Sequence, residues 1–258
     1  MRGHGGGAMS ARRVIRGFSL VELMVAMVLG LLLTAAAVSL FSTNQRTFQL
    51  QQTMGQLQEQ GQLAMRFINQ DVRKIGLVRE DVGALVLPGI ITTGASPAPS
   101  SNNDENGNDR LTFSFHGAVD CEGESLMPLQ NTVVVNTYWV DDDGQLNCEG
   151  NLSVGSNGVT LLRGVRSFQV LYGIDTEHDG IASVSQYITA DELDLDQDPV
   201  LAIKLGVLME ADLPSMSNAE QEQTFYILDS EVVVDEGRTM RRQFHSTVAI
   251  RNYSWEEI

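Results

Sequence analysis

Three acidic residues at alternating positions have the spacing of metal ligands. Asp175, Glu177 and Asp179 are followed by a glycine at position 180, which matches positions 1, 3, 5 and 6 of a Ca²⁺-binding loop. The position of the bidentate glutamate is occupied by Gln186, so the second half of the loop does not match. A solvated acidic turn is the simpler interpretation, and Ca²⁺ is the single cofactor that the sequence suggests. A second acidic run covers residues 191–198.

Common catalytic motifs are missing from the sequence. The four histidines form no His-Glu-x-x-His pair, and the chain has neither a Gly-x-Ser-x-Gly elbow nor a phosphate-binding Gly-Lys-Ser/Thr loop. Ser114 and His116 alternate on a predicted strand, where sharing a face is ordinary packing. We therefore expect that this protein is not an enzyme.

One carboxylate, Glu22, stands at the beginning of a long apolar segment. Residues 23–41 carry no charge, and at 1.5 Å per residue such a helix nearly spans a hydrocarbon layer of ~30 Å. A carboxylate costs on the order of 2.5–3.5 kcal/mol at the centre of a bilayer, less near an interface, so Glu22 needs a partner. The arginines of residues 12–16 precede the segment, which predicts a cytoplasmic N-terminus and an exported C-terminal part.

The apolar segment allows three interpretations. A secretory signal peptide has an apolar core of only about 7–15 residues, which is shorter than this one. A plain membrane anchor explains the length and the orientation but leaves Glu22 without a reason. The third interpretation rests on residues 17–22.

Residues 17–22 read GFSLVE, which resembles the processing site of type IV prepilins. In that family a membrane peptidase cuts after the glycine on the cytoplasmic side and N-methylates the new terminal phenylalanine. The acid at the fifth mature position then pairs with the terminal amine of a neighbouring subunit. The resemblance implies cleavage between Gly17 and Phe18, methylation of Phe18 and an assembly role for Glu22. Either Met1 or Met9 fits as the start of the leader.

The resemblance continues in the rest of the chain. Four segments are similar, in this order, to segments of PilW-type minor pilins: 67–76 (FINQDVRKIG), 108–112 (NDRLT), 137–141 (TYWVD) and 244–252 (FHSTVAIRN). These low-abundance pilins help to initiate pilus assembly near the filament tip, together with other minor pilins. Minor pseudopilins of type II secretion share the same N-terminal pattern and stay as an alternative. An anchored periplasmic binding module that never polymerises is a third possibility.

Two cysteines, Cys121 and Cys148, fall in the predicted periplasmic part, where disulfides form and persist. A bond between them closes a loop of about 28 residues and stabilises the fold by roughly 3–4 kcal/mol in the chain-entropy model. Free thiols acting as metal ligands are the alternative, but the local sequence lacks companion ligands. We favour a structural disulfide.

Charge excludes one class of partner. The chain has a net charge of −16, and residues 1–17 contain four arginines and no acid, which leaves −16 − 4 = −20 on the remainder. Such a body repels phosphate backbones and anionic lipid surfaces. We expect no binding to nucleic acid.

The elements that carry these residues follow from periodicity. Residues 42–76 lack proline, and from Met54 apolar or small residues recur at steps of three and four, which indicates an amphipathic helix that ends near Gly76. With the apolar segment this makes one helix of roughly 55 residues. Beyond it, short β-like runs separated by turns cover residues 84–87, 111–116, 132–140, 159–163, 167–174, 200–210, 225–234 and 244–252.

The sequence therefore predicts an α+β, pilin-like fold, in which a long N-terminal helix packs by its distal half on an antiparallel sheet. We expect a leader over 1–17, a membrane and assembly helix over 18–41, its amphipathic continuation over 42–76 and a β-rich periplasmic head over 77–258. The expected partners are other pilin and minor pilin subunits, the prepilin peptidase, the inner-membrane assembly platform and the lipid bilayer. The expected location is the inner membrane, crossed once, and the pilus after assembly.

Overall fold

The computed structural model describes residues 17–77, 89–94, 98–125, 132–153, 155, 157–177, 179, 181–197, 199–213, 221–235 and 237–252, apart from the Glu105 side chain. The predicted leader up to residue 16 and the predicted strand 84–87 lie outside these residues. The chain divides into two compact units, of which the first ends at Phe48 and the second begins at Gln49.

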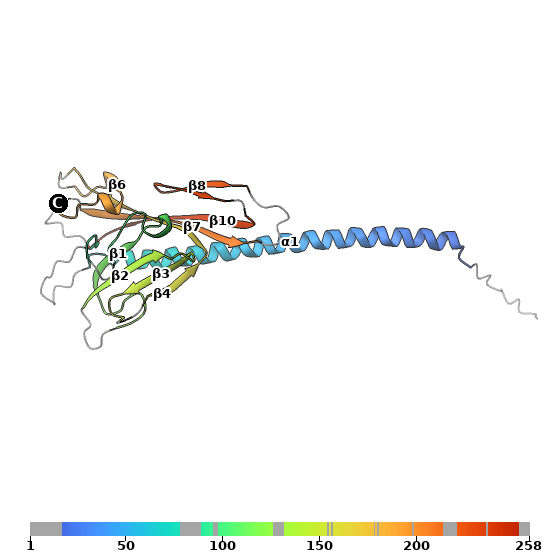
Figure 1. Cartoon of the computed structure of the whole chain (residues 1–258), viewed down its shortest axis with the longest axis horizontal. Helices are drawn as coiled ribbons and strands as arrows, with labels where there is room; N and C mark the ends of the chain where they lie inside the picture. The colour runs from blue at the N-terminus through green and yellow to red at the C-terminus, as the bar shows by residue number, and fades with distance from the viewer. Residues whose placement is uncertain are drawn as a thin grey trace, which may run out of the picture. The chain divides into compact units, whose positions relative to one another are not determined.

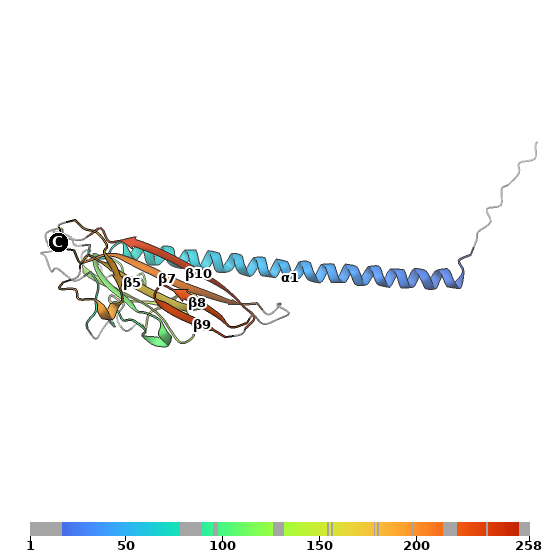
Figure 2. The same ribbon diagram turned by 90° about the horizontal axis from the view of Figure 1, so that it is seen from above.

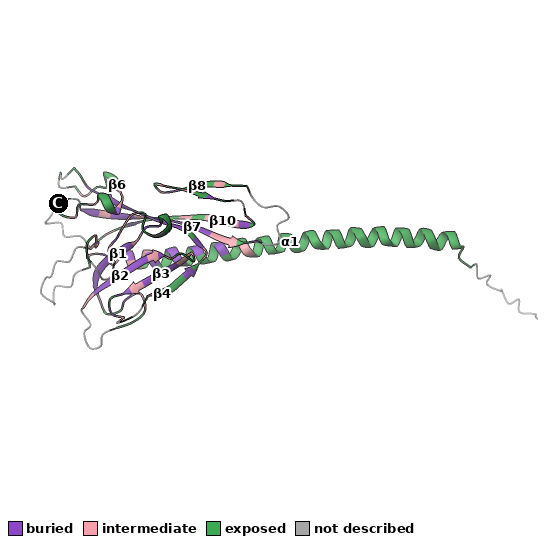
Figure 3. Ribbon diagram, viewed as in Figure 1, coloured by how far each residue is buried: buried purple, intermediate pink, exposed green. Residues whose placement is uncertain are grey.

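One α-helix, α1 (Leu20–Val72), belongs to both units. It begins directly after Ser19, whose Oγ accepts the backbone N–H of Glu22 at 3.2 Å and so caps the first turn. Proline, which would break the helix, is absent throughout its 53 residues. Every side chain of the part of α1 that lies in the first unit is exposed, as the green colour of this part in Figure 3 shows.

The part of α1 in the second unit buries one stripe of side chains. Its buried residues recur at steps of three and four, as one face of a helix requires: Leu57, Gly61, Ala64, Met65, Ile68 and Val72. Gly61 has a steric role, because a Cβ there would lie 2.2 Å from Cε2 of Phe244. The glycine lets helix and strand approach closely.

Within the described residues of the second unit, ten strands form three antiparallel groups (Figure 1). The first sheet has the order β1-β2-β3-β4 and the second the order β10-β7-β5-β6, while β8 and β9 form a hairpin. The bounds are β1 (Leu111–Gly117), β2 (Thr132–Val140), β3 (Gln145–Gly150), β4 (Val159–Arg163), β5 (Val165–Ile174), β6 (Gln186–Ile188), β7 (Val200–Asp212), β8 (Gln223–Ile227), β9 (Ser230–Val234) and β10 (Thr239–Ala249). Two short 3₁₀ helices, η2 (Glu105–Gly107) and η3 (Ala190–Glu192), lie in the connections.

The core of the second unit lies between the two larger sheets and the buried stripe of α1. It joins apolar side chains of α1, β1, β2, β5 and β7 in one cluster, which includes Ile68, Phe113, Tyr138, Phe168 and Ile203. The distal part of α1 runs beside β10, as both Figure 1 and Figure 2 show. Asn69 of α1 also donates a hydrogen bond from Nδ2 to Oγ of Ser246 on β10 at 2.8 Å.

The predicted fold class is confirmed, with differences at several boundaries. The helix ends at Val72 instead of near Gly76, because residues 73–76 turn away and Gly76 adopts a positive φ of 69°. The predicted strand 225–234 is wrong as a single element: it is the β8–β9 hairpin, which turns at Leu228 with a φ of 57°. β10 begins and ends earlier than predicted, and β3 and β6 had no prediction.

Candidate assembly site

The candidate site in the first unit is the beginning of α1. Gly17 and Phe18 precede the helix in extended, exposed chain, and Phe18 is 81 % exposed. Ser19 caps the helix, and Glu22 therefore occupies its first turn. The backbone around position 17 is accessible to an enzyme that cuts next to the helix.

Glu22 lies where the chain favours a negative charge. The free N–H groups of the first turn carry a partial positive charge, and an acid there stabilises a helix by about 0.3–1 kcal/mol. Ser19-x-x-Glu22 also has the spacing of a capping box, which the sequence analysis overlooked. From Gly17 onward, the described residues give the Glu22 carboxylate no ion-pair partner. Its charge is thus available to a group outside this chain.

The segment after Glu22 is long and apolar enough to cross a membrane, as judged by length and composition. Its large apolar side chains point outward on all sides of the helix, for example Leu23, Val28, Leu32 and Phe41. A helix that is apolar all round needs an apolar environment. The described part of this chain supplies none for residues 20–48.

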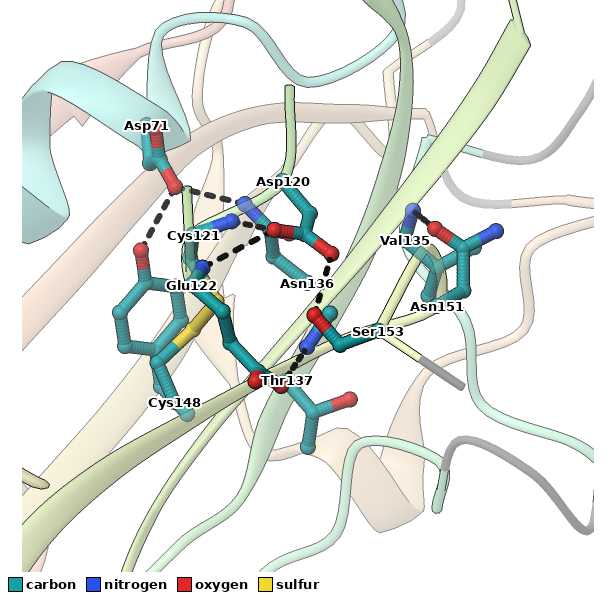
Figure 4. Close-up of a disulfide and its surroundings, with 12 residues drawn as sticks. Asp71, Asp120, Cys121, Glu122, Val135, Asn136, Thr137, Cys148, Asn151 and Ser153 are labelled. Atoms are coloured by element: carbon teal, nitrogen blue, oxygen red, sulfur yellow. Dashed lines mark hydrogen bonds between the residues drawn. A yellow bond between two sulfur atoms is a disulfide. The ribbon is translucent and has the colours of Figure 1, made fainter. Parts of the chain in front are cut away.

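In the second unit, a disulfide joins Cys121 to Cys148 on β3. This confirms the pairing that the sequence favoured. Figure 4 shows the surroundings of the bond, where Asp120 accepts backbone N–H groups from Glu122, Glu124 and Leu152 at 3.0–3.2 Å. Asp120 is buried, so its carboxylate organises the loop that carries Cys121.

Asp71 connects the end of α1 to β2 near this disulfide (Figure 4). Its Oδ2 accepts hydrogen bonds from the Tyr138 hydroxyl at 2.6 Å and from Asn136 Nδ2 at 2.7 Å, and its Oδ1 pairs with Lys74 Nζ at 2.6 Å. Asn136 in turn accepts the backbone N–H of Cys121. Burial, and then the neighbouring Asp71 charge, raise the pKa of Tyr138 well above its usual value. The hydroxyl therefore remains a donor that fixes Asp71.

Comparison with known families separates two regions of the chain. Residues 12–38 match the prokaryotic N-terminal methylation motif, and residues 137–252 match the family described as Type IV pilus-assembly protein W. The second match covers somewhat less than half of the chain. These matches assign the chain to type IV pilus assembly as a minor pilin. They include the GFSLVE segment and the PilW-like segments 137–141 and 244–252, whereas the similar segments 67–76 and 108–112 lie outside both matched ranges.

Structure comparison gives a more distant likeness. A type IV-like pilin from Thermus thermophilus is 16 % identical, with a TM-score of 0.45 over 76 % of this chain and 96 % of that chain. A search among curated proteins finds no match.

The three acids of the Ca²⁺ candidate lie in the connection between β5 and β6. Among the described residues, no three or more His, Cys, Asp or Glu side chains are grouped so that they could hold a metal ion. Asp175 is instead buried and accepts the backbone N–H groups of Glu177 and Ser183 at 3.0 and 3.2 Å. Glu177 and Asp179 are exposed. Asp175 thus shapes a turn, and Ca²⁺ binding by this run stays a prediction.

A buried acid that the sequence analysis missed lies at the entry to β1 of the pilin. Asp109 accepts the backbone N–H of Asn103 at 3.0 Å and that of Val170 at 2.7 Å, so it ties the 98–110 segment to β5. Burial raises its pKa to about 6, against these two hydrogen bonds, which lower it. Asp109 belongs to the NDRLT segment, and that resemblance was the one available signal.

Proposed function

We propose that this PilW-type minor pilin is made as a precursor that is cut between Gly17 and Phe18. Exposure of Gly17 and Phe18 next to a capped helix supports this proposal, together with the methylation motif over residues 12–38. The mature chain then begins at Phe18, with a methylated amine. The head over residues 77–258 faces the periplasm, and the basic leader stays in the cytoplasm.

Glu22 carries the proposal, since it is the one charge in the apolar part of α1. In the proposed filament, the Glu22 carboxylate pairs with the Phe18 amine of a neighbouring subunit. Each charge alone is costly in an apolar helix bundle, whereas a pair between two chains is tolerated. This pairing would let the subunit enter the growing filament with other pilins, and it would support initiation near the tip. Because PilW-type proteins are structural subunits, we expect the chain to act by assembly and not by catalysis.

Replacement of Glu22 tests this function. We expect Glu22→Ala to reduce incorporation of the protein into sheared filaments at least tenfold, because the neighbour's amine loses its partner, while the level in the inner membrane stays unchanged. Glu59→Ala is the matched control, since Glu59 is an exposed acid of the same helix. Immunoblots of filament and membrane fractions measure both quantities.

Mass spectrometry of the mature protein tests the processing step separately. The expected N-terminus is Phe18 with one added methyl group. A mature protein that begins at another residue, or Glu22→Ala subunits that enter filaments normally, would contradict the proposal. The second result would favour an anchored binding module. A minor pseudopilin would pass both tests, and co-purification with secretion-system subunits instead of pilus subunits would identify it.

A further inference from the structure

A groove of about 580 Å³ runs along the second unit between α1 and β10. One wall is formed by Gln62, Arg66 and Gln70 of α1 together with Arg73, which directly follows the helix, and the other is formed by Phe244 and His245. Steps of four place the three helical residues on one face. The backbone N–H of Arg73 still bonds to the carbonyl oxygen of Asn69 at 3.3 Å, as that of a further helical residue would. β10 is the last strand of its sheet, so the groove follows the edge where the sheet meets the helix.

The groove is open because its two walls are held at a fixed separation. Gly61 lets the Phe244 ring pack directly against α1, and the Asn69–Ser246 hydrogen bond joins the two elements one level farther along. The ring forms an apolar floor, while the longer polar side chains of α1 extend beyond it. The shape is therefore set by packing within the second unit and does not require a ligand to form it.

The polar side chains that line the groove are basic or neutral. Two guanidinium groups, two glutamine amides and an imidazole line the groove, and no Asp or Glu does. Across the described part of the chain, neither Arg66 nor Arg73 has an ion-pair partner. Arg73 is seven positions after Arg66, and because its backbone N–H still bonds to Asn69 as in a helix, the two Cα atoms lie about 10 Å apart along the axis. Arginine binds carboxylates with two parallel hydrogen bonds, so the pair presents two carboxylate sites.

This lining contrasts with the charge of the whole protein. The chain has a net charge of −16, and another groove of the second unit has a lining that includes Asp141, Asp142, Asp143, Glu210 and Asp212 with one arginine. A groove whose lining has two arginines and no acid, on such a body, favours a negatively charged occupant. A peptide segment also suits its shape, since an extended chain spans about 10 Å in three residues and can lay an apolar side chain on Phe244.

We propose that this groove binds an acidic segment of a neighbouring filament subunit, with two carboxylates held by Arg66 and Arg73. The proposal rests on the proposed function as a filament subunit, and it adds a contact on the head that is independent of Glu22. It fixes the orientation of the neighbour through charge complementarity.

Binding of an acidic peptide to the full-length protein in non-ionic detergent tests the groove. The probe is a fluorescein-labelled peptide with the sequence of residues 190–199, ADELDLDQDP, which includes acids three positions apart, such as Asp191 and Asp194. We expect fluorescence anisotropy to show binding that weakens at least tenfold in the double variant Arg66→Gln/Arg73→Gln. The matched control is Arg163→Gln, an exposed arginine of β4 outside the groove, which should bind as the wild type does. A peptide with Asn and Gln in place of the acids should not bind.

Three results would overturn the proposal. The first is that the Arg66→Gln/Arg73→Gln and Arg163→Gln variants bind the acidic peptide equally well, and the second is that the neutral peptide binds as tightly as the acidic one. The third is that a single-stranded oligonucleotide of the same charge binds as tightly as the acidic peptide, which would indicate a surface for any polyanion. Near-ultraviolet circular dichroism verifies that the double variant is folded. Filament incorporation of the variants distinguishes failure of the groove proposal from failure of the proposed function. If the Arg66→Gln/Arg73→Gln protein enters filaments normally while Glu22→Ala does not, the groove proposal is refuted and the proposed function stands.

Discussion

The two parts of α1 share one continuous helix but differ in what covers their apolar side chains. In residues 20–48 every side chain is exposed, and Leu31 is 71 % exposed. In residues 49–72 one stripe is buried against the sheets, and Ile68 is 0 % exposed. The first part has apolar residues on all sides, whereas the second has them on one face.

This difference shows which interactions the chain completes by itself. A stripe at steps of three and four is matched by the chain's own strands, so the second part is stabilised inside one molecule. An apolar surface on all sides exceeds what one sheet can cover, and its partners must be lipid or the helices of other subunits. Changes in the two parts should therefore be visible in different measurements.

The largest expected effect comes from shortening the same type of side chain in each part. Ile68→Ala should lower the free energy of unfolding of the second unit by about 2–5 kcal/mol, since it removes buried methyl groups and leaves a cavity. Leu31→Ala is the matched control and should leave this free energy unchanged. Urea unfolding of the full-length protein in detergent, followed by near-ultraviolet circular dichroism, measures both.

Equal destabilisation by Ile68→Ala and Leu31→Ala would contradict the comparison, because Leu31 would then need a partner within its own chain. An unchanged unfolding midpoint for Ile68→Ala would show that the stripe of α1 does not pack on the strands in solution.

Alanine substitutions at two glycines of α1 should change stability by smaller amounts and in opposite directions. Gly61→Ala should destabilise the second unit by about 1–3 kcal/mol, because the new methyl group collides with the Phe244 ring at 2.2 Å. Gly55→Ala meets nothing within 4 Å and should stabilise the helix by up to ~1 kcal/mol, since alanine favours a helix more than glycine does. Thermal unfolding of both variants measures the difference. A Gly61→Ala protein as stable as Gly55→Ala would refute the close approach of α1 and β10.

Periodicity predicted the elements whose pattern is uninterrupted. β2 and β4 have the predicted bounds, and the buried stripe contains Leu57, Gly61, Ala64, Ile68 and Val72 as expected. Met54 was also expected in the stripe but is 45 % exposed. Periodicity gives the face of a helix, but it does not give the point along the axis at which the sheets begin to cover it.

Other features depend on contacts between distant residues and have no local signal. The β8–β9 hairpin turns at Leu228 without the glycine or asparagine typical of a tight turn, so the sequence reads as one strand. Asp71 and Asp120 resemble ordinary surface acids in the sequence. Their roles appear only when β2 and the disulfide loop bring donors to them.

The smallest effect concerns pH and the buried Asp109 of the head. Its pKa is raised from 3.8 to about 6, chiefly by burial, while N–H groups of Asn103 and Val170 lower it and the charges of Asp229 and Asp191 raise it further. The folded state thus binds a proton that the unfolded state releases between about pH 4 and pH 6. Its contribution to stability is complete below pH 3.8 and is lost as the pH rises through 6.

Asp109→Asn removes the group that binds this proton, so the variant is the reference against which the pH dependence of the wild-type unfolding free energy is measured. Between pH 7 and pH 5 the wild type should gain about 1 kcal/mol of unfolding free energy relative to Asp109→Asn, since one extra proton is bound over roughly one pH unit of that interval. Urea unfolding at both pH values measures the gain, and Asp142→Asn, an exposed acid of the β2–β3 turn, is the control that should follow the wild type. A gain that persists in Asp109→Asn would assign the pH dependence to other acids. A gain seen only in proteins that keep Asp109 would instead show that the pH dependence arises at the contact that ties residues 98–110 to β5. This contact lies inside the second unit, so the pH dependence would be independent of the exposed part of α1.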